Sequence, residues 1–266
     1  MEFLGYILAT LVGVSLGLIG SGGSILTVPI LVYIMGVQPG VATAYSLFVV
    51  GSAALVGGVQ KARMKQLDVK TIWVYGIPSL LAVYLTRRWI VPAIPDVIIN
   101  LNGFVLTQSM FMMTLFAVIM LMAALSMIRS TSNTTISADQ TIQYNYPMII
   151  TASILEGLLT GLVGAGGGFL IIPALVLLAR LPMKLAVGTS LFIIATKSLI
   201  GFTGDLQGDL LIDWKLLITF TGCSIAGIFV GMFLSKFISG ERLKKAFGWF
   251  VLIMGIYIIA KVWFNL

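Results

Sequence analysis

Long apolar segments separated by short polar loops divide this 266-residue chain. Most of them approach the ~20 residues that a helix needs to cross the hydrocarbon core of a bilayer. The composition agrees, because 59% of the residues are hydrophobic and only 9% are charged, which no soluble domain combines. The pattern therefore predicts an all-α polytopic membrane protein. The expected segments are residues 3–19, 24–36, 41–59, 71–91, 110–128, 147–163, 168–180, 183–203, 214–236 and 246–264.

Two glycine-rich stretches interrupt apolar runs that are too long for one span. Gly20–Ser24 breaks the run over 3–36, and Gly164–Gly168 breaks the run over 147–180. A straight helix over 3–36 would be about 50 Å long at ~1.5 Å per residue, against a hydrocarbon core of about 30 Å. Each glycine inside a helix also costs about 1 kcal/mol relative to alanine. Each run is therefore expected to form a helical hairpin that turns at its glycines, inside or close to the membrane.

The two hairpins belong to an internal repeat. Residues 13–57 align with 157–201 without a gap, giving 16 identities in 45 positions. The sequence therefore predicts a repeat over 1–128 and a second over 147–266, joined by the polar linker Arg129–Tyr146. Each repeat would contain a hairpin and three further helices. The matched positions include Gly13/Gly157, Gly17/Gly161, Gly20/Gly164, Gly22/Gly166, Gly23/Gly167, Pro29/Pro173 and Ser46-Leu47-Phe48/Ser190-Leu191-Phe192.

Equivalent loops of the two repeats carry opposite charge. Loop 60–70 is basic, whereas loop 204–213 contains three aspartates and no basic residue. Basic loops stay in the cytoplasm, so loop 60–70 is expected to be cytoplasmic and loop 204–213 extracytoplasmic. Equivalent loops on opposite faces predict an inverted repeat in a multi-pass membrane protein. Arg87 and Arg88 oppose this assignment, because it places both of them outside.

Absent residue types exclude several kinds of chemistry. The chain has no histidine, which removes Ser-His-Asp and Cys-His catalysis and the usual zinc sites. It has one cysteine, Cys223, so no disulfide can form within the chain, and it has no P-loop motif for ATP. We therefore expect no enzyme activity, no cofactor and no metal. The net charge of +7 reads as a topology signal, so the expected partners are a lipid bilayer and a small anion, not nucleic acid. Homo-oligomer formation is left open.

The glycine-rich tips predict an anion site. The first turn of a helix presents unpaired N–H groups and about half a positive charge. Ser24 is the expected N-cap of a helix over 25–36, and Gly168 stands at the same place in the second copy. In an inverted repeat the two tips can meet near the midplane around one small anion. Close helix packing is the alternative, but it explains glycines spaced by four and not a cluster at a break.

Hydroxyl groups open the third helix of each repeat. Ser46 and Ser190 are equivalent in the alignment, and Thr189 precedes the second of them. Each hydroxyl can donate to a ligand oxygen, or it can bond a carbonyl one turn back along its own helix. Both interpretations stay open.

Glu156 and Lys197 are the only charges that the hydropathy pattern places deep within apolar segments. Each costs about 2.5–3.5 kcal/mol on insertion, which makes it a candidate for function. Lys197 can hold an anion or balance Glu156 in a structural pair. Glu156 can also carry a coupling proton, with Asp205 at the outer mouth as the second candidate. The candidate substrate-binding residues are Gly20, Ser21, Gly22, Gly23, Ser24, Ser46, Gly164, Ala165, Gly166, Gly167, Gly168, Thr189, Ser190 and Lys197.

The repeated motif resembles a known family. Gly-Leu-Ile-Gly-Ser-Gly-Gly-Ser before Pro29, repeated as Gly-Leu-Val-Gly-Ala-Gly-Gly-Gly before Pro173, is similar to the sulfite exporter TauE/SafE family, as is Gly-Thr-Ser-Leu-Phe at 188–192. The resemblance implies a bacterial- or archaeal-type transporter of the cell (inner) membrane, an exporter of sulfite, sulfonates or related sulfur-containing anions. We expect it to work as a secondary carrier by alternating access. A carrier for another small anion such as a carboxylate, and a non-transporting membrane scaffold, are the alternatives. Ala44-Tyr45 stands where the second repeat has Gly188-Thr189, so the halves need not contribute equally.

Overall fold

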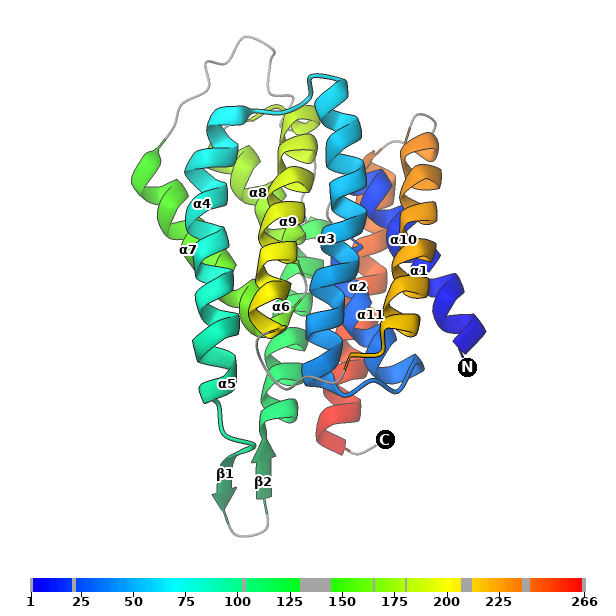
Figure 1. Ribbon diagram of the computed structural model, residues 1–266, viewed down its shortest axis with the longest axis vertical. Helices are drawn as coiled ribbons and strands as arrows, with labels where there is room; N and C mark the ends of the chain where they lie inside the picture. The colour runs from blue at the N-terminus through cyan, green and yellow to red at the C-terminus, as the bar shows by residue number, and fades with distance from the viewer. Residues whose placement is uncertain are drawn as a thin grey trace.

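The chain folds into a bundle of helices with one short β-hairpin at its lower end (Figure 1). The structure is a computed structural model that describes residues 2–20, 23–101, 104–129, 145–164, 166–179, 181–206, 212–235 and 240–264. Among these residues, six helices are long and apolar enough to cross a membrane. In chain order the elements are α1 (Glu2–Ile19), α2 (Ser24–Pro29), η1 (Ile30–Ile34), α3 (Pro39–Arg63), α4 (Val69–Leu85), η2 (Thr86–Ile90), α5 (Val91–Ala93), β1 (Val97–Leu101), β2 (Phe104–Thr107), α6 (Gln108–Arg129), α7 (Tyr146–Val163), α8 (Gly168–Leu177), α9 (Met183–Asp205), α10 (Trp214–Leu234) and α11 (Gly240–Phe264).

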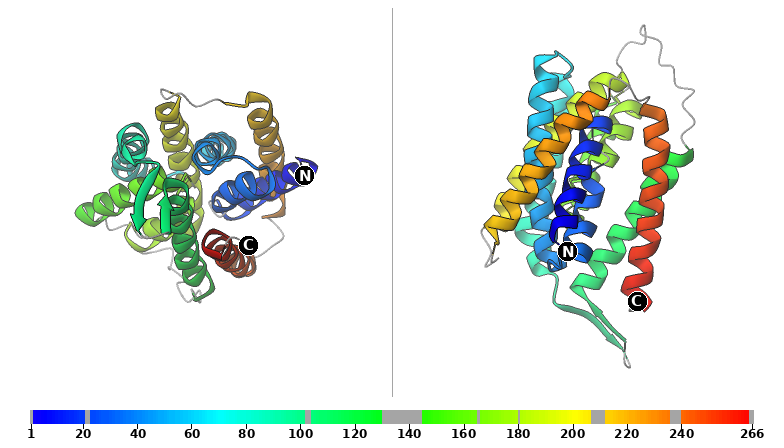
Figure 2. Two further views of the ribbon diagram at one scale, coloured as in Figure 1. Left: turned by 90° about the horizontal axis from the view of Figure 1, so that it is seen from below. Right: turned by 90° about the vertical axis from the view of Figure 1, so that its right-hand side faces the viewer.

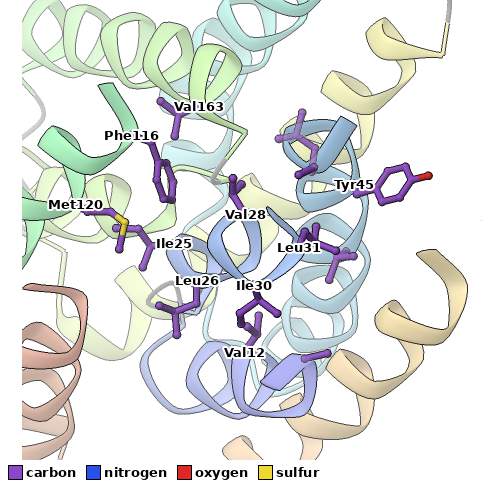
Figure 3. Close-up of a cluster of buried hydrophobic side chains, with 14 of the residues drawn as sticks. Val12, Ile25, Leu26, Val28, Ile30, Leu31, Tyr45, Phe116, Met120 and Val163 are labelled. Carbon is purple, nitrogen blue, oxygen red and sulfur yellow. The ribbon is translucent and has the colours of Figure 1, made fainter. Parts of the chain in front are cut away.

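The predicted fold class is confirmed, including both helix breaks. The first apolar run is split into α1 and α2, which continues as the π-helical turn η1, and the second is split into α7 and α8. In lipid, backbone groups must be paired within the protein, so a short half-helix persists only where other helices surround it. The whole of α2 is buried. Figure 3 shows its side chains between Val12 of α1 and the pair Phe116 and Met120 of α6.

Each helix of one repeat packs against a helix of the other. The pairs are α1 with α10, α7 with α4, α3 with α9 and α6 with α11. If each helix is replaced by its equivalent in the other repeat, the same four pairs result. Large apolar side chains such as Trp73 of α4 and Phe233 of α10 are about 60% exposed on the outside of the bundle, as expected for a surface facing lipid.

Glycines bring the paired helices close together. A methyl group on Gly13 of α1 would lie 1.9 Å from the carbonyl oxygen of Ser224 on α10. A methyl group on the equivalent Gly157 of α7 would lie 2.5 Å from the carbonyl oxygen of Ser79 on α4. The glycines spaced by four in each repeat are thus packing residues, as small residues are at membrane helix contacts. They are distinct from the tip glycines.

The fourth helix of each repeat starts at an aspartate. The carboxylate of Asp68 accepts a hydrogen bond of 2.8 Å from the backbone N–H of Thr71, at the start of α4. The carboxylate of Asp213 accepts one of 3.1 Å from the N–H of Leu216, at the start of α10. Each cap satisfies one of the unpaired N–H groups of the first turn. The loop 64–68 before α4 lies at the upper end of the bundle in Figure 1, whereas α10 begins at the lower end.

The segment predicted over 71–91 is confirmed as one helical span from Val69 to Ala93. Two features of the first repeat were not predicted, the first being the π-helical turn η2 through which α4 continues into α5. Residues 97–107 then form the antiparallel pair β1–β2, which extends beyond the ends of the helices (Figures 1 and 2).

Candidate functional site

The first tip connects α1 to α2. Gly20 has a φ of +84°, a conformation that suits glycine and few other residues. Gly23 precedes α2 as its N-cap and Ser24 is the first helical residue, so the prediction of Ser24 as N-cap was wrong by one position. Gly23 is pressed against α1, since a methyl group on it would lie 2.2 Å from the carbonyl oxygen of Val12. Ser21 and Gly22 lie outside the described residues.

The second tip connects α7 to α8 and is built from three glycines in the left-handed region. The φ angles are +72° at Gly164, +65° at Gly166 and +62° at Gly167. Residues with a side chain rarely adopt this backbone conformation, so the path of the backbone requires the glycines. Gly167 is the N-cap of α8 and Gly168 is its first residue, which repeats the arrangement of the first tip. Ala165 lies outside the described residues.

The two tips lie next to each other. A methyl group on Gly166 would lie 3.4 Å from Cβ of Ser24 in the first tip and 2.7 Å from a methyl of Val50 on α3. Two glycines thus serve different contacts in the second tip, because Gly166 faces the first tip and Gly167 faces its own repeat.

Each tip also rests on the third helix of the other repeat. A methyl group on Gly164 would lie 2.5 Å from Cβ of Thr43 on α3. A methyl group on Gly20 would lie 2.5 Å from a methyl of Val187 on α9. Thr43 and Val187 are equivalent positions in the repeat alignment. Each tip therefore packs against a helix of the other repeat.

The equivalent serines of the two repeats have different hydrogen bonds. Ser190 donates a bond of 2.9 Å to the carbonyl oxygen of Val187, one turn back in α9. Ser46 is fully buried, and its hydroxyl has no partner within the described part of the chain. The same holds for Thr27 on α2, which the sequence analysis missed, although a hydroxyl within the turn after the tip was a usable signal.

Thr189 anchors a loop. Its hydroxyl oxygen accepts a 2.9 Å hydrogen bond from the backbone N–H of Asp68, at the end of the loop 64–68. In the other repeat the hydroxyl of Tyr45, the residue equivalent to Thr189, accepts a bond from the backbone N–H of Asp213. The residues that differ between the repeats at this position thus make equivalent contacts.

Glu156 and Lys197 form a buried ion pair directly behind the second tip. Lys197 Nζ donates to Glu156 Oε1, Thr160 donates to the same oxygen at 2.6 Å, and Ser79 donates to Oε2 at 2.7 Å. Both carboxylate oxygens are therefore paired. A methyl group on Gly167 would lie 1.7 Å from Glu156 Oε1, so the carboxylate contacts the N-terminal end of α8.

A second buried ion pair joins Arg87 and Asp205. Arg87 Nη1 lies 3.5 Å from Asp205 Oδ1 and donates a 3.0 Å hydrogen bond to the hydroxyl of Thr43. Arg87 is only 2% exposed and Asp205 only 8%. The prediction that Glu156 and Lys197 are the only deep charges was therefore wrong, because Arg87, which the charge pattern placed on the outer side of the membrane, is buried. Its helix continues through η2, which carries the charge back into the protein.

A cavity with a volume of about 260 Å³ opens at the other end of the bundle, between α3 and α10. Polar groups line part of it, among them Lys61, whose ammonium donates a 3.1 Å hydrogen bond to the side-chain oxygen of Gln66. Its lining consists of Gln60, Lys61, Met64, Gln66, Phe229, Met232, Phe233 and Ser235.

The sequence matches proteins named as membrane transporters along most of its length. A "Probable membrane transporter protein" of Xylella fastidiosa (strain 9a5c) is 30% identical over 260 residues, covering 96% of this chain and 94% of that protein. "Probable membrane transporter protein YunE" of Bacillus subtilis (strain 168) is 30% identical over 220 residues, covering 76% and 77%. No solved structure gives a significant match.

The family model described as "Sulfite exporter TauE/SafE" matches residues 6–258, which include both tips and both buried ion pairs. A match of this extent, together with the relatives named above, confirms the resemblance noted from the repeated glycine motif. The protein is a multi-pass membrane transporter and belongs to the TauE/SafE family.

Proposed function

We propose that the protein is a secondary transporter of a small oxyanion of the sulfite or sulfonate type, held between the two glycine-rich tips. The observation that carries this proposal is the proximity of Gly166 to Ser24, which lie so close that a methyl group on Gly166 would touch Ser24, with Val50 of α3 beside them. Backbone donors at two helix starts suit an anion. The buried hydroxyls of Ser46 and Thr27, without partners in the described residues, add donors that a ligand would satisfy.

The number of separate elements that carry donors favours a three-oxygen anion. The donors come from separate elements: the first tip and α2, the second tip, and Ser46 on α3. Sulfite and sulfonates carry three oxygens in a pyramid and can accept from three directions, whereas a carboxylate has two oxygens in a plane. Each good hydrogen bond to such a charged ligand is worth about 1.5–3 kcal/mol.

The ion pair of Glu156 and Lys197 packs against the second tip on the side that faces its own repeat. Glu156 is paired through both oxygens and lies against Gly167, whereas Gly166 faces the first tip. We therefore assign Lys197 and Glu156 to holding the second tip in place. The first repeat has Val12 and Ala53 at these positions, so the first tip has no such support.

Alternating access would follow from an inverted relation between the repeats. The symmetric pairing of helices and the opposite positions of the loop 64–68 and the start of α10 support this relation. The cavity near Lys61 lies at one end, and the pair Arg87–Asp205 joins helices at the other. This arrangement fits a state open toward the loop 64–68, which the basic residues assign to the cytoplasm.

The topology has its own test. Met64 is 51% exposed and Leu206 is 44% exposed. They directly follow α3 and α9, whose C-terminal ends lie at opposite ends of the bundle in Figure 1. In a Cys223→Ser background, a thiol introduced by Leu206→Cys should react with an impermeant reagent in intact cells. A thiol introduced by Met64→Cys should react only after the cells are opened. Reaction of both in intact cells, or of Met64→Cys alone, contradicts the assigned orientation.

Ligand binding tests the function. The purified full-length protein should be titrated calorimetrically with sulfite, methanesulfonate, thiosulfate, sulfate and acetate at matched ionic strength, with chloride as control. Sulfite or methanesulfonate should bind most tightly, and the same anion should be carried by the protein in sealed liposomes. Tightest binding of acetate would indicate a carboxylate carrier. No binding of any of these anions would refute the proposed anion site between the tips.

A further inference from the structure

We propose that Arg87 keeps one end of the transport path closed by pairing with Asp205, and that it opens this end by exchanging Asp205 for the oxyanion. This inference rests on the proposed function and adds a second anion-binding residue to it. Arg87 sits in η2 of the first repeat, and Asp205 ends α9 of the second. The pair therefore joins the two repeats.

The guanidinium of Arg87 is incompletely paired. Only Nη1 has partners, namely the Thr43 hydroxyl at 3.0 Å and Asp205 Oδ1 at a long 3.5 Å. Arg87 Nε and Nη2 have no acceptor in the described part of the chain, and Asp205 Oδ2 has no donor there. Arginine and a carboxylate usually pair through two parallel hydrogen bonds, which this pair does not form.

The contrast with the other ion pair separates their roles. In the pair of Lys197 and Glu156, both carboxylate oxygens of Glu156 accept hydrogen bonds, which a buried ion pair needs if it is to be stable. Arg87 and Asp205 are as deeply buried but leave charged N–H and O groups without partners. A ligand that supplies acceptors to unpaired buried donors removes the free-energy cost of leaving them unpaired. The incompletely paired Arg87 is thus the residue that can bind a substrate anion.

The unpaired groups define the ligand. Nε–H and one N–H of Nη2 lie on the same edge of a guanidinium and bind two oxygens of one oxyanion. Sulfite, sulfonates and carboxylates all present such oxygens, so this residue recognises the anion and does not discriminate within the class. The Asp205 carboxylate is the competing internal anion.

The position of Arg87 connects this exchange to the tips. The Thr43 hydroxyl that accepts from Arg87 belongs to the residue on which Gly164 of the second tip rests. Thr43 also donates a 2.7 Å bond to the carbonyl oxygen of Gly40, one turn back in α3. Arg87 itself occupies a π-helical turn, a local change of helix geometry that occurs often at functional sites. Movement of the guanidinium toward an anion would therefore release α3 and the second tip together.

Two substitutions and one chemical probe test the exchange. Arg87→Lys keeps the charge but loses the paired N–H edge, so sulfite binding should weaken at least about tenfold. The neighbouring Arg88 is exposed, and Arg88→Lys is the matched control that should bind as wild type. Asp205→Asn removes the competing charge and should tighten sulfite binding. Phenylglyoxal, read out by peptide mass spectrometry, should modify Arg87 slowly in wild type and faster in Asp205→Asn, and sulfite should slow that reaction.

The outcomes separate this inference from the proposed function. Wild-type sulfite binding with unchanged affinity in both Arg87→Lys and Asp205→Asn would overturn the exchange and leave the site at the tips intact. Absence of anion binding in wild type would overturn the proposed function and the exchange together. If Arg87→Lys does not fold, the Asp205→Asn arm decides. No faster modification of Arg87 in that variant, or no protection by sulfite, refutes the exchange.

Discussion

Replacing Ser46 by alanine separates a binding role from a structural one. The Ser46 hydroxyl is fully buried and has no partner in the described residues, so the Ser46→Ala protein loses no internal hydrogen bond. A buried hydroxyl without a partner costs about 1–3 kcal/mol in protein mutational data. The free energy of unfolding should therefore stay the same or rise. If the hydroxyl donates to the substrate, binding should lose about 1.5–3 kcal/mol, which is roughly ten- to 150-fold in Kd.

Ser190→Ala is the matched control, because Ser190 occupies the equivalent position and already donates to the carbonyl oxygen of Val187. It should lower the free energy of unfolding by about 1 kcal/mol and change Kd by less than about threefold. Calorimetric titration with sulfite gives both Kd values, and thermal unfolding without ligand gives both stabilities. Wild-type affinity in Ser46→Ala, or a clear loss of its stability in the absence of ligand, would refute the reasoning.

The buried ion pair and the second tip yield two further predictions. Lys197→Met should destabilise the protein by about 3–5 kcal/mol, because it leaves Glu156 buried without its cation, and adding Glu156→Leu should restore most of the loss. The double variant should keep sulfite binding in calorimetry; loss of binding there would return Lys197 to the substrate site. Gly167→Ala should lower the unfolding temperature strongly, since the methyl group would lie 1.7 Å from Glu156 Oε1. Gly222→Ala in α10 meets no atom within 4 Å and should leave that temperature unchanged or raised, and equal effects of the two would contradict the assigned contacts.

Much of the fold could be predicted from local patterns in the sequence. Runs of apolar residues predicted the helices, and the glycine clusters predicted both breaks, because a break inside a membrane must be compact. The pairing of Glu156 with Lys197 was one of two readings left open, and the contacts found favour it. A deep charge needs a partner, and each was the nearest candidate in the pattern.

The misses share a cause in tertiary structure. Arg87 lies near the end of the predicted segment 71–91, and hydropathy alone cannot distinguish a charge that reaches water from one that is buried in the bundle. Ser46 and Ser190 stand in identical Ser-Leu-Phe triplets, yet only Ser190 bonds its own helix. The β1–β2 hairpin did leave a local signal. Asn102-Gly103 between two apolar stretches is a typical hairpin sequence.

The contact between α1 and α10 has a consequence for how the chain is made. α1 ends at Ile19 and its partner α10 begins at Trp214, so ribosomes must add about 200 residues before the two can dock. At about 5–20 residues per second, this leaves α1 without its partner α10 for about 10–40 s. Gly13 and Gly17, which face α10, tolerate that delay, since a glycine exposes no side-chain polar group to hydrocarbon. Glu156 and Lys197 do not have to wait as long, because the two charges are made only 41 residues apart. Among the four helix pairs, the pair that is farthest apart in the sequence is thus also the one whose contact is safest to leave unmade.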